Sequence, residues 1–190
     1  IEDKIFPKQN SLLKGGNNEL LSEKEFVAKI LAANEAKKDK DFLIIARIEA
    51  LISELGMNEA IKRADAYEKA GADAILIHSK QKEPDEIFEF ADTWNGNLPI
   101  VAIPTTYDNV RISDLHNHKI KMVIYANQTL RTSHAAMLKL LKEMKDAERI
   151  SDVKEPMSTM NEIFELQEMY DIKNKEKDLE NELKKLGYIN

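Results

Sequence analysis

Four short apolar runs alternate with longer amphipathic stretches through the middle of the chain. The runs are rich in Ile and Val, are too short for helices, and are bounded by polar, Gly or Pro residues. This pattern is typical of buried strands in a parallel sheet. We predict strands over residues 42–48, 74–78, 100–103 and 122–126.

Helix signals lie between these runs. Ser22 and Glu25 form a capping-box pattern that opens a helix. Asn58 can cap a second helix, and Gly71 suits the position just after its end. Pro84 is compatible with the first turn of a third helix. We predict helices over residues 22–37, 58–71, 84–94, 111–118 and 129–148, the last with an apolar face.

Repeated strand–helix units with short loops predict a parallel α/β sheet. A doubly wound sheet, a (β/α)8 barrel and a four-stranded open sheet all remain compatible with this pattern. A barrel typically needs about 250 residues, so with 190 residues we would expect one incomplete at its N-terminus. No GxGxxG or Walker A pattern follows any of the predicted strands, which removes the usual support for a nucleotide-binding open sheet.

The pattern changes after residue 152. Thr159 and Glu162 form a second capping-box pattern that predicts another helix. Beyond it the chain is highly charged, and roughly heptad spacing connects Ile172, Leu179, Leu183 and Leu186. Such spacing fits either a helix that packs on a partner or a solvated terminal helix.

Composition narrows the function classes. The chain has 34 acidic and 28 basic residues, for a net charge of −6, which argues against nucleic-acid binding. It has no cysteine, so disulfides and thiolate metal sites are excluded. No apolar run approaches the roughly 20 residues of a membrane helix, and no secretory signal is visible. We therefore expect a soluble, cytoplasmic protein with no membrane or nucleic-acid partner.

Polar residues stand where the predicted strands end. In parallel α/β folds ligands bind at the carboxyl ends of the strands. Arg47 lies within an apolar strand, where its guanidinium must either face a polar pocket or form a structural ion pair, for example with Glu49. The remaining three ends carry His78-Ser79, Thr105-Thr106 and Asn127. Together they predict a polar rim around a small anionic molecule.

The first 21 residues contain the most specific signal. Glu2-Asp3-Lys4 is followed, after five residues, by Asn10-Ser11, in a polar segment that leads to Gly15-Gly16. By itself this segment is either a movable lid or an ordinary surface loop. The spacing, however, is similar to the EDK-x5-NS signature of phosphoenolpyruvate phosphomutases, in the isocitrate lyase/phosphoenolpyruvate mutase superfamily. The resemblance covers roughly residues 1–170 and includes the segments 46–50, 70–80, 104–105 and 126–127.

The resemblance implies a (β/α)8 TIM-type barrel that interconverts phosphoenolpyruvate and phosphonopyruvate with Mg²⁺, in phosphonate biosynthesis. It places Glu2 in the Mg²⁺ environment, through water, and Lys8 and Asn10 on a gating loop over residues 3–21. Arg47 and His78 would bind the transferring phosphoryl group. Ser11 completes the motif and is counted with the substrate-binding residues.

Asn10 bears on the choice among related activities. The resemblance to phosphonopyruvate hydrolase is close, but that enzyme has Thr at the position of Asn10, and superfamily lyases carry a cysteine-containing loop motif instead. Asn10 and the absence of cysteine therefore favour the mutase over the hydrolase and the lyases.

The resemblance also predicts domain organisation. The family's direct Mg²⁺ ligands and early phosphate-binding loop precede the motif, and no residues of this chain can be assigned to them. We therefore expect residues 1–155 to form the C-terminal part of the barrel. Residues 156–190 would form a helical extension that is exchanged in a homodimer or homotetramer, or that leads to a further domain. A function of another class, a non-catalytic half-barrel that acts as an interaction module, also remains open.

Overall fold

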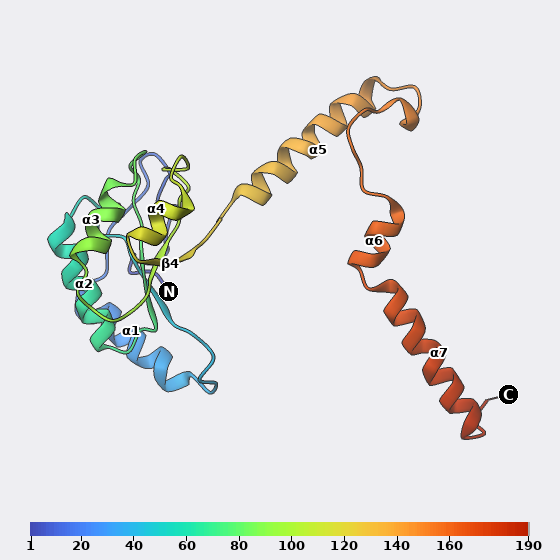
Figure 1. The fold of residues 1–190 in the computed structure, drawn as a ribbon, viewed down its shortest axis with the longest axis horizontal. Helices are drawn as coiled ribbons and strands as arrows, with labels where there is room; N and C mark the ends of the chain where they lie inside the picture. The colour runs from blue at the N-terminus through green and yellow to red at the C-terminus, as the bar shows by residue number, and fades with distance from the viewer. Residues whose placement is uncertain (190) are drawn as a thin grey trace. The chain divides into compact units, whose positions relative to one another are not determined.

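The computed structural model describes residues 1–189. The chain divides into two compact units, the second of which begins at Thr129. The first unit is a four-stranded parallel sheet with helices between the strands (Figure 1). Its elements are α1 (Glu23–Ala36), β1 (Ile45–Ile48), α2 (Met57–Lys69), β2 (Ala74–Ile77), α3 (Asp85–Thr93), β3 (Ile100–Ala102), α4 (Ile112–Asn117) and β4 (Ile120–Val123). The domain boundary predicted at residue 155 stays a prediction.

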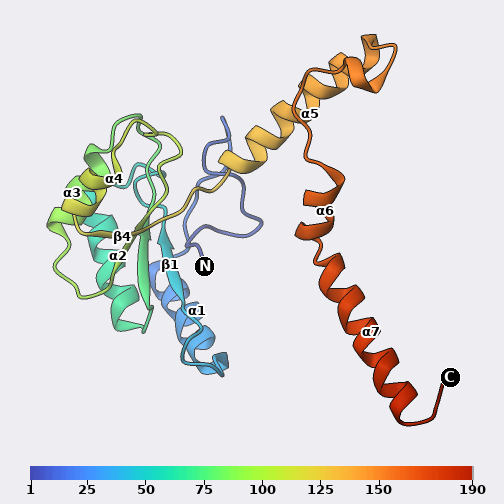
Figure 2. The ribbon, with the colours of Figure 1, turned by 45° about the vertical axis from the view of Figure 1, so that its right-hand side comes forward.

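The strand order is β1-β2-β3-β4, with every neighbouring pair parallel. Strand order that follows the sequence without reversal is the order of a (β/α)8 barrel, whereas doubly wound sheets reverse at a switch point. Residues 1–3 extend the series as a further parallel edge beside β1, through a bridge between Glu2 and Arg47 (Figure 2). The predicted α/β class with TIM-type strand order is confirmed.

All four helices of this unit pack on one face of the sheet. A single buried cluster joins strand residues such as Ile48, Ile75 and Ile100 to Phe26 of α1 and Phe90 of α3. A smaller cluster lies on the opposite face of the sheet. It consists of Ala74, Leu76, Val101 and Ile103. Because side chains alternate along a strand, apolar residues on both faces produce the continuous runs seen in the sequence.

Several predicted helix ends agree with the structure, although Pro84 stands at the N-cap of α3 rather than in its first turn and α5 ends at Asp146 rather than at residue 148. Ser22 and Glu25 form the expected capping box of α1, and Gly71, at φ 90°, takes the left-handed conformation that follows α2. The prediction that Asn58 caps α2 is wrong. The helix already begins at Met57, after Gly56 with φ 83°, so Asn58 lies within the first turn.

The fourth strand is shifted from its predicted position at 122–126, since β4 covers Ile120–Val123. Its partner β3 has only three residues, and the ladder between them ends at the pair Ala102 and Val123. Tyr125 is 59% exposed, beyond that last pair. The prediction therefore overlaps the strand by two residues.

The second unit is helical. It contains α5 (Gln128–Asp146), a short 3-10 helix (Ile150–Asp152), α6 (Met160–Leu166) and α7 (Met169–Lys185). The capping box at Thr159 and Glu162 is present, and the ring of Phe164 meets that of Tyr170 edge-on, with centroids 6.4 Å apart. Across residues 1–189, none of the helices has the length and apolar character needed to span a bilayer.

Candidate functional site

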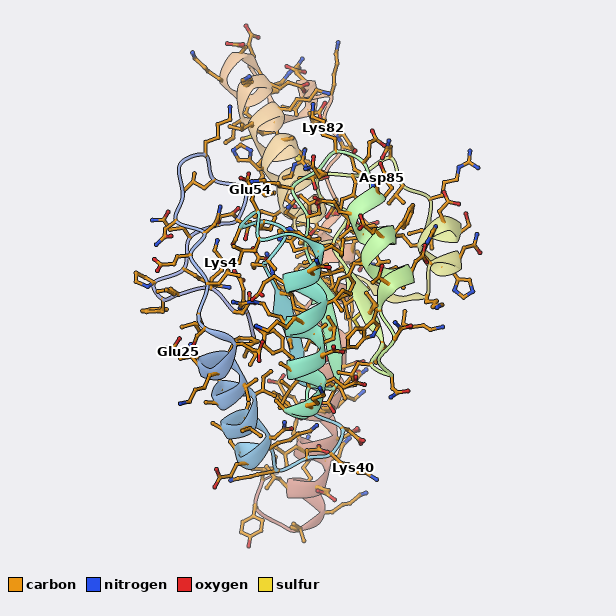
Figure 3. The ribbon with its side chains drawn as sticks, turned by 90° about the vertical axis from the view of Figure 1, so that its left-hand side faces the viewer. Lys4, Glu25, Lys40, Glu54, Lys82 and Asp85 are labelled. Atoms are coloured by element: carbon orange, nitrogen blue, oxygen red, sulfur yellow. The ribbon has the colours of Figure 1, made fainter. Side chains whose placement is uncertain are left out.

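A cavity of about 350 Å³ opens at the carboxyl ends of the strands. In Figure 3 this end of the first unit is marked by Glu54 and Lys82, which follow β1 and β2. Lys40, which precedes β1, marks the opposite end. The cavity is lined by Glu2, Lys8, Gln9, Asn10, Ser11, Leu12, Arg47, His78, Ile103, Thr105, Ala126 and Asn127. All six residues that the sequence singled out as site residues, Glu2, Lys8, Asn10, Ser11, Arg47 and His78, are therefore gathered around one cavity.

The N-terminal segment is held against β1 by backbone hydrogen bonds. The Arg47 amide donates to the Ile1 carbonyl at 2.8 Å, and the Asp3 amide donates to the Arg47 carbonyl at 3.2 Å. This pairing leaves Glu2 at the cavity, where its side chain is 8% exposed. Lys8 lies 2.8 Å and the Arg47 Nε lies 3.7 Å from the Glu2 carboxylate.

The loop over residues 3–21, which the sequence predicts to be a gating loop, is closed at its base. The Leu21 amide donates to the Asp3 carbonyl at 2.9 Å, and a bridge joins Lys4 to Leu20. Arg63, on α2, donates to the Asp3 carboxylate and to the Leu21 carbonyl, both at 3.0 Å. Burial raises the pKa of Asp3, against the opposing effects of the hydrogen bond from the Glu49 amide and of Arg63 and Tyr67. One guanidinium therefore clamps both ends of the loop.

Lys4 braces the loop from within (Figure 3). Its side chain is buried, and its ammonium donates to the Gln9 carbonyl at 2.9 Å and to the Asn18 side-chain oxygen at 2.7 Å. These contacts join the two arms of the loop. Asn10, at the tip, is exposed, and its side-chain oxygen accepts from the Leu12 amide at 2.9 Å. Sequence reasoning gave Asp3 and Lys4 no role, although both belong to the motif.

Glu49 lies behind the cavity and connects its polar residues. It is fully buried, and its carboxylate accepts from Arg47 Nε at 2.7 Å and from the Ser11 hydroxyl. His78 Nδ1 is 2.9 Å away. Burial works to raise the pKa of Glu49, but the hydrogen bond from His78, the charge of Arg47 and the hydrogen bond from Ser11 outweigh it and lower the pKa to about 2. Glu49 is therefore ionised and surrounded by the hydrogen-bond donors Arg47, Ser11 and His78.

The two interpretations of Arg47 both hold. Its Nε forms the structural pair with Glu49, while its Nη2 lies 3.4 Å from the Ser11 hydroxyl and 2.9 Å from His78 Nδ1. Arg47 and Glu49 are two residues apart at the end of β1, so they point to the same side. The sequence analysis named Glu49 as a possible ion-pair partner of Arg47, but not its contacts with Ser11 and His78.

The remaining rim residues divide into two groups. Thr105 and Asn127 line the cavity as expected. Ser79 does not, because it follows His78 directly and points to the other side of the chain. Its hydroxyl donates to Glu86 at 2.6 Å, and its carbonyl accepts from Thr106. The expectation that Ser79 joins an anion site is wrong.

The residues that line the cavity can contact Mg²⁺ through water but do not form a set of direct ligands. Mg²⁺ is usually held by one or two carboxylates together with several waters and substrate oxygens. Glu2 is the one carboxylate among the lining residues, and residues 1–189 contain no group of three or more His, Cys, Asp or Glu side chains placed to bind a metal. Glu2 can therefore contact the ion through water, whereas a direct ligand set is not formed by the described residues.

Charge and donors make the cavity suited to a small anion. Lys8 and Arg47 bring positive charge, and His78, Asn10 and Thr105 add hydrogen-bonding groups. An Arg fork and neighbouring donors match the geometry of phosphoryl or carboxylate oxygens. The loop that carries Lys8 and Asn10 forms one wall of the cavity.

Comparison with known proteins agrees with this geometry. The family model for phosphoenolpyruvate phosphomutase matches residues 1–145. The phosphoenolpyruvate phosphomutase of Tetrahymena pyriformis is 42% identical over 93% of this chain and 59% of its own. The phosphonopyruvate hydrolase of Variovorax sp. (strain Pal2) is 45% identical over 88% of this chain and 58% of its own. The chain thus spans about three-fifths of the length of these relatives.

Solved structures give the same assignment. A phosphoenolpyruvate phosphomutase from Streptomyces platensis subsp. rosaceus matches with a TM-score of 0.89 and 39% identity, over 94% of this chain and 62% of that one. A phosphonopyruvate hydrolase in complex with oxalate and Mg²⁺ matches with a TM-score of 0.82 and 41% identity, over 92% of this chain and 59% of that one. The match of sequence, fold and motif shows that this chain belongs to the phosphoenolpyruvate phosphomutase family.

Proposed function

We propose that this chain carries the gating loop and the phosphoryl-binding rim of a phosphoenolpyruvate mutase, which interconverts phosphoenolpyruvate and phosphonopyruvate. The observation that carries the proposal is the convergence of Asn10, Arg47 and His78 on one cavity under a clamped loop. In this proposal Lys8, Asn10, Arg47 and His78 act on the substrate. Such an enzyme would catalyse the entry step of phosphonate biosynthesis.

The residue types suit the chemistry. In the forward reaction the P–O bond of phosphoenolpyruvate breaks, and the phosphoryl group forms a P–C bond with C3 of the resulting pyruvate enolate. Phosphoryl transfer through a loose transition state needs positioning and charge stabilisation more than a strong nucleophile. Arg47 and His78 can hold the equatorial phosphoryl oxygens, and Lys8 adds charge at the open side. Asn10 can donate a hydrogen bond without acting as a base.

Exclusion of water decides between transfer and hydrolysis. A metaphosphate-like phosphoryl group reacts with any water that reaches it, so the loop must stay closed while the group moves. The brace of Lys4 within the loop and the clamp of Arg63 at its base support such closure. Both act on the segment that carries Asn10.

A second candidate is phosphonopyruvate hydrolase, favoured by the 45% identity of the Variovorax relative. Asn10 supports the mutase, since the resemblance places Thr at this position in the hydrolase. Phosphorus NMR of a full-length enzyme that contains this chain, with phosphonopyruvate and Mg²⁺, separates the two; we expect little turnover from these 190 residues alone. We expect phosphoenolpyruvate to accumulate; release of inorganic phosphate and pyruvate without phosphoenolpyruvate would overturn the mutase in favour of the hydrolase.

Mg²⁺ is the proposed cofactor, supported by the hydrolase complex with oxalate and Mg²⁺. When bound, the ion would supply positive charge to the oxygens of the pyruvate part of the substrate. Glu2 would hold one of its waters, and the Lys8–Glu2 pair at 2.8 Å would open or rearrange as the ion enters. Loss of turnover in EDTA, restored by added Mg²⁺, tests this role.

Two further proposals concern assembly. We infer a homodimer or homotetramer in which the helical segment from Thr159 to Tyr170 is exchanged between subunits, and a monomeric mass in solution would contradict it. The alternative of a non-catalytic interaction module has its own test. Mg²⁺-dependent turnover by the purified chain, with its mass verified, would reject the module.

A further inference from the structure

Three donors converge on one buried carboxylate behind the cavity. Glu49 does not line the cavity, yet Arg47 Nε, the Ser11 hydroxyl and His78 Nδ1 all face its two oxygens. These partners come from β1, the gating loop and the end of β2, which are far apart in sequence. Nothing in the proposed chemistry gives Glu49 a task, although a fully buried carboxylate needs a reason for its place.

His78 Nδ1 has two neighbours that demand opposite roles. It lies 2.9 Å from Arg47 Nη2, which can only donate, and 2.9 Å from a Glu49 oxygen, which as an anion can only accept. One ring nitrogen cannot satisfy both. Arg47 Nη2 has another acceptor within reach, the Ser11 hydroxyl at 3.4 Å, whereas Nδ1–H to an ionised carboxylate is a charge-assisted bond. Nδ1 therefore carries the proton, and Nε2 is left for the cavity.

The Ser11 hydroxyl is already used by the protein. A serine hydroxyl offers one donor and two acceptor lone pairs. It donates to Glu49, and it lies 3.4 Å from Arg47 Nη2 and 3.5 Å from the Lys4 ammonium, both of which can only donate to it. This set fills its capacity in the closed loop, so Ser11 joins the loop to the strand end and leaves substrate contact to Asn10 and Lys8.

We propose that Glu49 is the positioning residue of this site: it fixes the His78 tautomer and the Arg47 fork and, through Ser11, latches the gating loop over them. The proposal rests on the proposed function only in supposing that Arg47, His78 and the loop act on one substrate. It implies that loop closure and the arrangement of the phosphoryl-binding pair depend on the same carboxylate.

The proton on His78 tests the first part. Long-range ¹H–¹⁵N NMR of the ¹⁵N-labelled protein distinguishes a proton-bearing ring nitrogen from one with a lone pair. We expect His78 to carry its proton on Nδ1 in the wild type and in the matched control Glu54→Gln, whose carboxylate is exposed and pairs with Lys80. Glu49→Gln has one acceptor oxygen for three donors, so we expect its His78 signals to move to a mixture of tautomers.

Loop opening tests the second part. Trypsin can cleave after Lys8 and Lys14, both exposed in the loop, and the cleavage rate follows the open population when opening is fast. Loss of a hydrogen bond to a charged group corresponds to about a 10- to 100-fold change in that population. We expect this increase in Ser11→Ala and Glu49→Gln but not in Glu54→Gln.

Two results would overturn the proposal. One is a wild-type His78 that carries its proton on Nε2 with a lone pair at Nδ1. The other is a Ser11→Ala protein that is cleaved no faster than Glu54→Gln, a comparison that remains available even where Glu49→Gln does not fold. Neither readout depends on turnover, so a failure to detect mutase or hydrolase activity would count against the proposed function and leave the role of Glu49 intact.

Discussion

Arg63 offers a quantitative test of how the loop is anchored. Its guanidinium, on α2, is almost fully buried and joins the Asp3 carboxylate, the Tyr67 hydroxyl and the Leu21 carbonyl at 3.0 to 3.1 Å. Asp3 is fully buried and also accepts from the Tyr67 hydroxyl at 3.0 Å. Replacement of Arg63 by Met keeps most of the apolar stem and removes the guanidinium donors to Asp3, Tyr67 and Leu21, while the Tyr67 hydroxyl can still donate to Asp3.

The expected destabilisation follows from the burial of Asp3. Removal of one partner from a buried ion pair leaves the other charge uncompensated, which costs about 3–5 kcal/mol. The Leu21 carbonyl would lose a partner as well. With an urea m-value of about 2 kcal/mol/M, the midpoint of unfolding should fall by about 1.5–2.5 M. The double variant Asp3→Asn/Arg63→Met removes the stranded charge and should recover part of this loss.

Urea unfolding followed by circular dichroism gives the measurement, with Lys62→Met as the control. Lys62 is next to Arg63 on α2, but its side chain is 64% exposed and its ion pairs with Glu23 and Glu59 lie at the surface. Such pairs contribute about 0–1 kcal/mol. If Arg63→Met were no more destabilising than Lys62→Met, or if the double variant lost as much as the two single variants added, the clamp would not hold the loop as described.

Three more results are expected. In a full-length enzyme that contains this chain, Arg47→Lys should lower turnover about 100-fold or more, because an ammonium cannot reproduce the fork between Glu49 and a phosphoryl group; an unchanged kcat/KM would contradict this role. The pKa of Glu49 is lowered from 4.5 to about 2. Its ionised form therefore adds of the order of 3 kcal/mol to the free energy of unfolding above pH 4.5, and this contribution is lost as the pH falls toward 2. We expect the free energy of unfolding of Glu49→Gln to fall less steeply with acid than that of the wild type. Ser22→Ala removes the N-cap of α1 and should reduce the unfolding free energy by about 1 kcal/mol, read from thermal unfolding and absent in Ser113→Ala.

Local patterns predicted much of the fold. The capping boxes at Ser22 and Thr159 depend on residues three apart, so they could be recognised without knowledge of the tertiary structure. The first three strands were placed within a few residues, because apolar runs mark strands buried on both faces. The C-terminal end of β4 was placed too late, because its pairing stops where β3 stops, at the pair Ala102 and Val123. The residues around Met122 do not indicate where the neighbouring strand ends.

The site was predicted as a set of residues but not as a network. Position at the strand ends and the resemblance to a family identified Arg47 and His78. The contacts of Glu49 with Ser11 and His78, 38 and 29 residues away, depend on which strands are neighbours and which way their side chains alternate. Ser79 shows the same limit, because one residue of offset from His78 turns its hydroxyl away from the cavity.

The closed base of the gating loop has a consequence for how new activities could arise. Residues 3–5 pair with residues 19–21, and Arg63 binds both ends to α2. The ends of the intervening segment are therefore fixed independently of the residues between them. The entropy of closing such a segment grows slowly, by about 0.6 kcal/mol for each doubling of length. Segments of different length and sequence could therefore be exchanged between these anchors while the strands and the residues at their ends, Arg47 and His78 among them, stay in place. Evolution, or a protein engineer, could change the residues that face the cavity by grafting a loop, with little loss of stability.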